Sequence, residues 1–307
     1  MAAEAVIRIE GLVKRFGKLT AVDGVSLDVQ RGEVFGILGP NGAGKTTTLE
    51  CVEGLLEPTS GHTFILGVDT HKEPEKVKER IGIQLQASAY FDYLTLTEIL
   101  ELFGKFYHRH LPPDALLQRV GLADKAKSTV AHLSGGQRQR FTIAATLVND
   151  PEVVFLDEPT TGLDPQARRS LWEFIQDLHR EGRTVVLTTH YMEEAQFLCQ
   201  RVAIMDMGVI VALDTPARLI HALPVPYVVK VTAAKGLPLE EVQRLDGVKE
   251  VSHNNGEYSI RTADAAVTLT ALISWATGNG TRLEHLEVAS ANLEDVFLAL
   301  TGKALRE

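Results

Sequence analysis

A glycine-rich stretch at residues 39–46 constrains the fold of this chain more than any other segment, because it fits the phosphate-binding pattern G-x-x-x-x-G-K-[ST]. The apolar residues 34–38 before it suit a buried strand, and apolar residues after it recur at helical spacing as far as Leu56. A flexible surface loop would not explain this order of strand, loop and helix. The sequence therefore predicts a site for the phosphate groups of a nucleotide.

The chemistry of such a loop follows from its residue types. Glycines let backbone N–H groups turn toward a phosphate, and the start of the following helix adds a partial positive charge. Lys45 is expected to reach the β- and γ-phosphates, and the Thr46 hydroxyl to bind Mg²⁺. The residues predicted to surround the phosphates are Gly39, Pro40, Asn41, Gly42, Ala43, Gly44, Lys45, Thr46 and Thr47.

Length and composition exclude several other classes of protein. A chain of 307 residues with 45% apolar content can form two domains, and a net charge of −9 argues against a surface built for nucleic acid. No apolar run approaches the length of a membrane span, and the N-terminus lacks the basic head of a signal peptide. We expect a cytoplasmic protein in which Cys51 and Cys199 are buried thiols.

Polar side chains follow three predicted strands at the point where each strand ends. Asp157 and Glu158 end one apolar run, His190 ends the next, and Gln86 ends an earlier one. Ligands of open parallel sheets bind outside this edge. Asp157 is expected to hold Mg²⁺ through water, Glu158 to accept a proton from an attacking water, and His190 to contact the γ-phosphate or that water. Ordinary turn chemistry is the alternative for the acidic pair, and Gln86 alone is a weak signal.

Two further segments are candidate nucleotide contacts. Phe16 precedes the phosphate loop by two predicted strands, and it could stack on an adenine ring or equally be a core residue. Residues 133–140 begin a helix at which Ser134 is a good N-cap and two glycines leave the first N–H groups uncovered. This helix start is a second candidate anion site, with an ordinary capped helix as the alternative.

In combination, these motifs resemble the nucleotide-binding subunits of ABC transporters. The resemblance covers residues 6 to about 220 and implies an α/β P-loop NTPase fold, with a RecA-like parallel sheet core, an antiparallel β lobe and a helical subdomain at about 87–145. The motifs that match in order and spacing are the phosphate loop, Gln86, residues 133–137, the Asp157 and Glu158 pair, residues 162–164 and His190.

The resemblance also implies how two such chains share ATP. In that family two cassettes face head to tail, so Ser134, Gly135, Gly136 and Gln137 are expected to bind the nucleotide held by the phosphate loop of the other copy. Asp164 would communicate across the interface, Gln86 would sense Mg²⁺ or water, and Phe16 would stack on adenine, where tyrosine is usual. No motif is degenerate, so both sites of a homodimer should be active.

A separate integral membrane permease is the partner that the resemblance implies. The helical block, with residues 87–93, would receive it, and the chain would lie on the inner face of the cell membrane. Residues 188–195, 212–216 and 292–297 resemble bacterial ABC-2-type export ATPases of the drug-resistance group. Such exporters move drugs, lipids or polysaccharides.

Three alternative functions are less consistent with the sequence. A soluble ABC ATPase of translation would carry two cassettes, and one of DNA repair a long coiled coil between Gln86 and Ser134. A P-loop kinase would not explain the helix that begins after Ser134. An importer subunit stays open, because the cassette motifs do not encode the direction of transport.

Residues 221–307 form a second predicted domain, following a first at residues 1–220. Its expected order of elements is β-α-β-β-α-β with a final helix, which predicts a small α+β ferredoxin-like sandwich. No residue cluster in it suggests chemistry. A dimerisation or regulatory role and a passive appendage are equally open.

Overall fold

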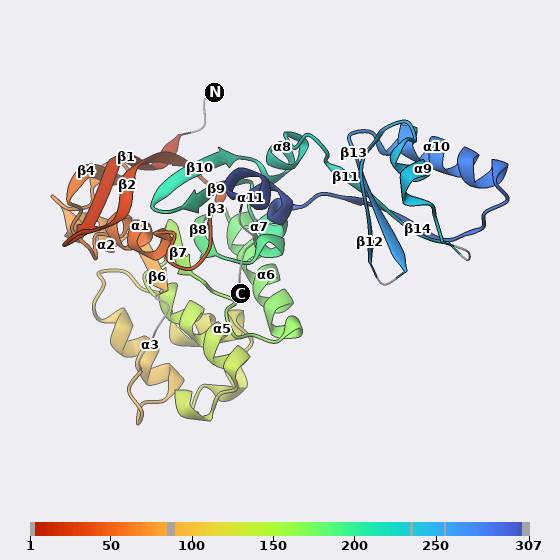
Figure 1. Ribbon diagram of the computed structural model, residues 1–307. Coiled ribbons are helices and arrows are strands. Elements are labelled where there is room, and N and C mark those ends of the chain that lie inside the picture. The colour runs from red at the N-terminus through yellow and green to blue at the C-terminus, as the bar shows by residue number, and fades with distance from the viewer. Residues whose placement is uncertain (1–3, 85–89, 234–235, 255, 303–307) are drawn as a thin grey trace. The chain divides into compact units, whose positions relative to one another are not determined.

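The computed structural model describes residues 4–84, 90–233, 236–254 and 256–302. The chain forms two compact units, Met1–Thr215 and Pro216–Glu307 (Figure 1). The sequence had put the boundary after residue 220, so helix α8 (Pro216–His221) belongs to the second unit rather than to the first. No helix among the described residues is both long and apolar enough to cross a membrane.

The first unit is built around a six-stranded sheet in which every strand runs parallel to its neighbours except β10. Strands β3, β7 and β8 are buried along their whole length, which explains their continuous apolar sequences. β3 lies beside β8, and β8 beside β7, so the loops that follow these strands emerge at one edge. In sheet order the strands are β10 (Val209–Asp214), β9 (Arg201–Asp206), β3 (Val34–Leu38), β8 (Thr184–Thr189), β7 (Val153–Asp157) and β6 (Ile81–Gln84).

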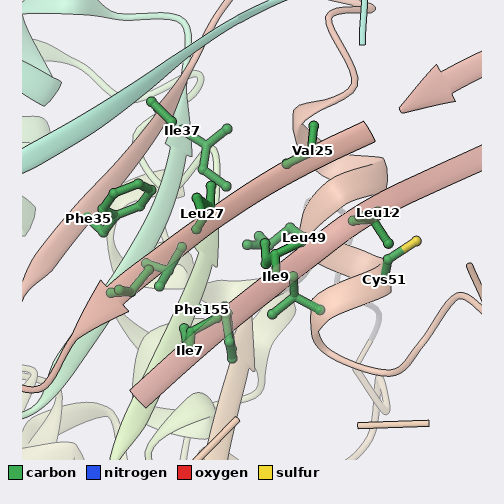
Figure 2. Close-up of a cluster of buried hydrophobic side chains, with 14 of the residues drawn as sticks. Ile7, Ile9, Leu12, Val25, Leu27, Phe35, Ile37, Leu49, Cys51 and Phe155 are labelled. Atoms are coloured by element: carbon green, nitrogen blue, oxygen red, sulfur yellow. The ribbon is translucent and has the colours of Figure 1, made fainter. Parts of the chain in front are cut away.

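An antiparallel sheet forms the predicted β lobe of the same unit. Its order is β2 (Leu19–Gln30), β1 (Ala5–Phe16), β4 (Ser60–Ile65) and β5 (Val68–Asp69). Apolar side chains from this sheet, from α1 and from the parallel sheet share one core. Figure 2 shows this core, with Ile7, Ile9, Leu12, Val25 and Leu27 of the lobe beside Leu49 and Cys51 of α1 and Phe35, Ile37 and Phe155 of the parallel sheet.

Three helices of the first unit form the inserted helical block. The inserted helical block contains α3, α4 and α5, and Figure 1 shows α3 and α5 lying together below the parallel sheet. Thr95 and Glu98 form a capping box that starts α3. The helices of this unit are α1 (Lys45–Val52), α2 (Pro74–Lys78), α3 (Leu96–Gly104), α4 (Pro113–Arg119), α5 (Gly135–Thr146), α6 (Pro165–Arg180) and α7 (Met192–Leu198), with short 3₁₀ turns at Ala123–Lys125 and Val130–His132.

Helix α1 ends four residues before the apolar spacing predicted. It stops at Val52, whereas the sequence pattern continued to Leu56. Gly54 takes φ +76, a left-handed conformation that ends helices, and a Cβ there would lie 3.1 Å from the carbonyl oxygen of Thr70. The left-handed Gly54, together with the hydrogen bond from the Leu55 N–H to the Glu50 carbonyl oxygen at 2.9 Å, therefore ends α1 early.

The second unit is a ferredoxin-like sandwich, as predicted. Its antiparallel sheet has the order β12, β13, β11 and β14, and Val229, Val231, Tyr258, Ile260 and Leu272 lie in its core. Its elements after α8 are β11 (Tyr227–Ala233), α9 (Leu239–Gln243), β12 (Val248–Asn254), β13 (Glu257–Thr262), α10 (Ala265–Gly278), β14 (Leu283–Ser290) and α11 (Leu293–Thr301).

Candidate nucleotide-binding and catalytic site

The phosphate loop joins β3 to α1, and packing as well as conformation requires its glycines. A Cβ on Gly39 would lie 2.3 Å from the Met205 carbonyl oxygen, and one on Gly44 would lie 2.3 Å from the Ala21 carbonyl oxygen. Gly42 has open space around it, but its φ of +81 is one that side chains rarely adopt. Gly44 starts α1 without a side-chain cap, which leaves the first N–H groups of the helix as donors for an anion.

A cavity of about 420 Å³ opens beside this loop. Phe16 is 48% exposed in its wall, so it is not a core residue, and the Lys14 ammonium lies 5.1 Å from the centre of its ring. Leu19 and Ala21, from the strand that pairs with β1, form part of the same wall. The lining residues are Phe16, Leu19, Ala21, Asn41, Gly42, Gly44, Lys45, Thr46, Thr47 and Glu158.

Lys45 is buried and lines this cavity. Its ammonium donates to the carbonyl oxygens of Gly39 at 2.9 Å and Pro40 at 3.1 Å, and it lies 3.6 Å from the Glu158 carboxylate. Burial lowers the pKa of Lys45, while the negative charges of Glu158 and Asp157 act against the shift. A phosphate would offer the same ammonium a stronger negative partner than the two carbonyls do.

Asp157 ends β7, and hydroxyl groups from two other elements bind its carboxylate. Thr46 lies 3.2 Å and 3.1 Å from the two carboxylate oxygens, and Thr188 of β8 donates to Oδ1. Gln84, at the end of β6, donates to the Asp157 carbonyl oxygen at 3.3 Å. Gln86, the predicted metal or water sensor, lies outside the described residues.

Glu158 follows directly and has the left-handed φ of +46, which costs free energy in a residue other than glycine. Its backbone N–H donates to the Thr188 hydroxyl at 3.0 Å and to the Thr188 carbonyl at 3.2 Å. Its carboxylate accepts a hydrogen bond from Thr161 at 3.2 Å. The His190 Nδ1 lies 3.3 Å from Glu158 Oε1, although the two do not make a directed hydrogen bond.

The helix start at residues 133–140 lies elsewhere in the unit. Ser134 caps α5, accepting from the Gln137 N–H at 3.3 Å while the Gln137 side chain accepts from the Ser134 N–H at 3.0 Å. Gly135 is exposed and Gly136 half-buried. None of these residues is in the wall of the described cavity. Within one chain, this second candidate anion site is not part of the described cavity.

Asp164 caps α6, its carboxylate accepting from the N–H groups of Gln166 and Ala167 at 3.0 Å each. This contact gives Asp164 a local structural role, and its predicted part in an interface between two copies stays a prediction.

The structure thus brings together the phosphate loop, Asp157, Glu158 and His190 at one sheet edge. Sequence reasoning missed Thr188, which contacts both carboxylate-bearing residues, and Leu19 and Ala21 in the cavity wall. The signal for the wall residues was the short turn that returns the chain past Phe16. In the sequence, the only indication that Thr188 lies at the site was its position two residues before His190.

Comparison with known families matches both units. Residues 22–161 match the family described as ABC transporter, and residues 230–292 match the C-terminal domain of ABC transporter domain-containing protein-like sequences. The first match contains the phosphate loop and the strand that carries Asp157. The second falls within the ferredoxin-like unit.

Individual relatives extend the similarity to almost the whole chain. The linearmycin resistance ATP-binding protein LnrL of Bacillus subtilis is 38% identical, over 98% of this chain and 100% of the relative. The Nod factor export ATP-binding protein I of Ralstonia nicotianae is 37% identical, over 98% of this chain and 95% of the relative. A solved dimeric structure of a bacterial ABC transporter cassette is 29% identical, with a TM-score of 0.62 over 68% of this chain and 98% of that one.

Proposed function

The chain belongs to the ABC transporter family as an ATP-binding subunit, and we propose that it hydrolyses ATP to power a separate permease that exports its substrate. The observation that carries the hydrolytic part is the grouping of Lys45, Asp157 and Glu158 at the mouth of a phosphate-binding loop, with Lys45 and Glu158 3.6 Å apart.

The chemistry needed at this site is mainly charge neutralisation and positioning, because the transferred phosphoryl group needs little covalent help. Lys45 and the N-terminus of α1 would neutralise the phosphates. Glu158 would accept a proton from the attacking water, since its carboxylate lies at the cavity and beside Lys45. His190, whose Nδ1 lies 3.3 Å from the Glu158 carboxylate, would donate an imidazole N–H to the γ-phosphate or to that water.

The residues at this edge also fit Mg²⁺. The Thr46 hydroxyl and the Asp157 carboxylate are oxygen donors of the kind that Mg²⁺ takes, and they lie 3.1 Å apart at their nearest. Thr46 would bind the ion directly and Asp157 through water, with Gln86 as the third predicted contact. When bound, the ion would neutralise charge on the β- and γ-phosphates.

The site would be completed by a second copy of the chain. The solved relative is a dimeric cassette. In this chain the helix start at Ser134 does not line the cavity that contains Lys45. In a head-to-tail homodimer, Ser134 and Gly136 of one copy would bind the γ-phosphate held by the other. Asp164 would then lie near the contact between the copies. ATP would bridge the two chains, so its binding free energy would drive closure.

The permease is proposed to bind the helical block, α3 to α5 with residues 87–93, and to hold the chain on the inner face of the cell membrane. The names of the relatives, linearmycin resistance and Nod factor export, support export rather than import or a non-transport role, and the proposed substrates are drugs, lipids or polysaccharide. The ferredoxin-like unit is proposed to take part in dimerisation or regulation. Its described residues contain no cluster able to hold a metal ion.

One experiment tests the transport assignment. The tagged chain is isolated from membranes of its native host in mild detergent, and the integral proteins that remain with it are identified. We expect a multi-span permease, and its loss when the helical block is altered at exposed Tyr93 and Phe106. Recovery of only soluble partners or ribosomes under conditions that preserve membrane complexes would leave an ATPase and refute the transport role.

A further inference from the structure

Thr188 occupies a position that the catalytic scheme above does not use. It lies on β8, paired in register with Asp157 on the parallel neighbour β7, and it is fully buried. Its hydroxyl makes two hydrogen bonds, to the Asp157 carboxylate and to the Glu158 backbone N–H. It therefore contacts both of the carboxylate-bearing residues at once.

The direction of these two hydrogen bonds is fixed by chemistry. A threonine hydroxyl has one proton to donate and two lone pairs to accept with, whereas a backbone N–H can only donate. The Thr188 oxygen must therefore accept from Glu158, and its one proton must go to Asp157 Oδ1. The hydroxyl therefore holds one oxygen of the Asp157 carboxylate as its acceptor.

The Glu158 backbone needs such support. Its left-handed φ of +46 persists only where surrounding contacts hold it. Its N–H is shared between the carbonyl and the hydroxyl of Thr188, and its carbonyl accepts from the Thr161 N–H at 3.2 Å. Losing the hydroxyl would remove one of the two acceptors of the Glu158 N–H.

The Asp157 carboxylate has two hydroxyl partners, Thr46 and Thr188. Only Thr46 is also predicted to bind Mg²⁺. Thr46 belongs to the phosphate loop and is the proposed Mg²⁺ ligand, whereas Thr188 lies in the sheet and does not line the described cavity. If the Thr46 oxygen turns to the metal, Thr188 is the donor that continues to orient the carboxylate.

We propose that Thr188 is a positioning residue for ATP hydrolysis. Its hydroxyl binds both the Asp157 carboxylate and the Glu158 backbone N–H. In this way it keeps a fixed separation between Asp157, the proposed metal contact, and Glu158, the proposed base. The proposal rests on the ATPase function proposed above. It assigns Thr188 no contact with nucleotide, so ATP affinity without metal should not depend on it.

The test compares Thr188→Val with a matched control on the same strand. Thr184 is also buried, and its hydroxyl accepts from the Gly32 N–H at 2.9 Å at the opposite end of β8. Both valine variants lose a buried hydroxyl that accepts from a backbone N–H, and T188V alone also loses a donor to a carboxylate. Only T188V should disturb the site.

Three readouts are expected to separate the variants. T188V should lower kcat about 10- to 100-fold with little change in the KM for ATP. It should raise the Mg²⁺ concentration for half-saturation at least about fivefold, measured by fluorescence of a bound non-hydrolysable ATP analogue. Its affinity for the analogue in EDTA should stay within about twofold of wild type. T184V should match wild type in all three, and Thr188→Ser, which keeps the hydroxyl, should recover most of kcat.

Equal kcat and equal Mg²⁺ half-saturation in T188V and T184V would overturn the proposal. Should T188V fail to fold, Thr188→Cys carries the same test, because a thiol fills similar space but is a weak donor and acceptor. A wild-type chain that binds the analogue but does not turn ATP over would refute the proposed function. The Mg²⁺ titration would still decide the role of Thr188.

Discussion

Glu53 gives a prediction that is independent of transport. This carboxyl group follows α1, is 4% exposed, and its Oε1 has no hydrogen-bond partner among the described residues. Burial raises the pKa of Glu53 to about 8, and the negative charges of Asp157 and Glu50 add to the shift. The folded chain therefore keeps a proton on Glu53 at pH values where the unfolded chain has lost it.

The sign of the pH effect follows from proton binding. Between about pH 4.5 and pH 8 the folded state binds more protons at Glu53 than the unfolded state does, so the free energy of unfolding falls as pH rises. A shift of this size corresponds to at most about 5 kcal/mol across that range. Below about pH 4.5 the contribution of Glu53 to the free energy of unfolding is constant, because Glu53 is protonated in both the folded and the unfolded state.

The substitution Glu53→Gln replaces the carboxyl group with an amide, which cannot ionise. The difference in unfolding free energy between E53Q and wild type should be small near pH 5 and should grow by roughly 3 kcal/mol or more in favour of E53Q by pH 8. The buried amide adds a cost of its own, but that cost does not change with pH. The slope with pH, and not the offset, is therefore the diagnostic quantity.

Urea unfolding without nucleotide or metal measures this slope. The chain has two tryptophans, Trp172 in the first unit and Trp275 in the second, so a Trp275→Phe background makes fluorescence report on the unit that contains Glu53. Exposed Glu57→Gln is the control, since it removes the same charge from the same segment. Parallel pH profiles for E53Q, E57Q and the background chain would refute the reasoning.

Three further predictions concern the site itself. Glu158→Gln should lower kcat more than about 100-fold while ATP affinity is kept, and it should trap a closed dimer detectable by light scattering; near-normal turnover would exclude Glu158 as the base. Lys45→Ala should weaken ATP binding by about tenfold or more, because the phosphate charge loses its buried ammonium, and calorimetry showing unaltered affinity would contradict this. Phe16→Ala should weaken ATP binding about tenfold while Phe16→Tyr stays within about twofold; a similar loss with both would argue against stacking on adenine.

Sequence reasoning anticipated the parts of the site that depend on local pattern. The phosphate loop has a fixed spacing, and buried parallel strands have apolar sequences that end visibly at Asp157 and His190. These two signals were enough to predict the parallel sheet and the edge of it at which Lys45 and Glu158 meet.

The remainder depends on contacts between segments far apart in the sequence. Thr188 reads as one more strand residue until the register of β8 against β7 puts its hydroxyl beside Asp157. The charge on Glu53 gave no hint of burial. Gln86 lies outside the described residues, so its role stays a prediction.

The two cysteines have a practical consequence for observing closure of a dimer. Both are buried free thiols, and burial raises the pKa of Cys51 to about 11 and that of Cys199 well above its usual value. Maleimide reagents attack the thiolate, so neither residue should react while the chain is folded. A single cysteine introduced at an exposed position such as Glu173 could carry a fluorophore or spin label in an otherwise native sequence, without a cysteine-free background.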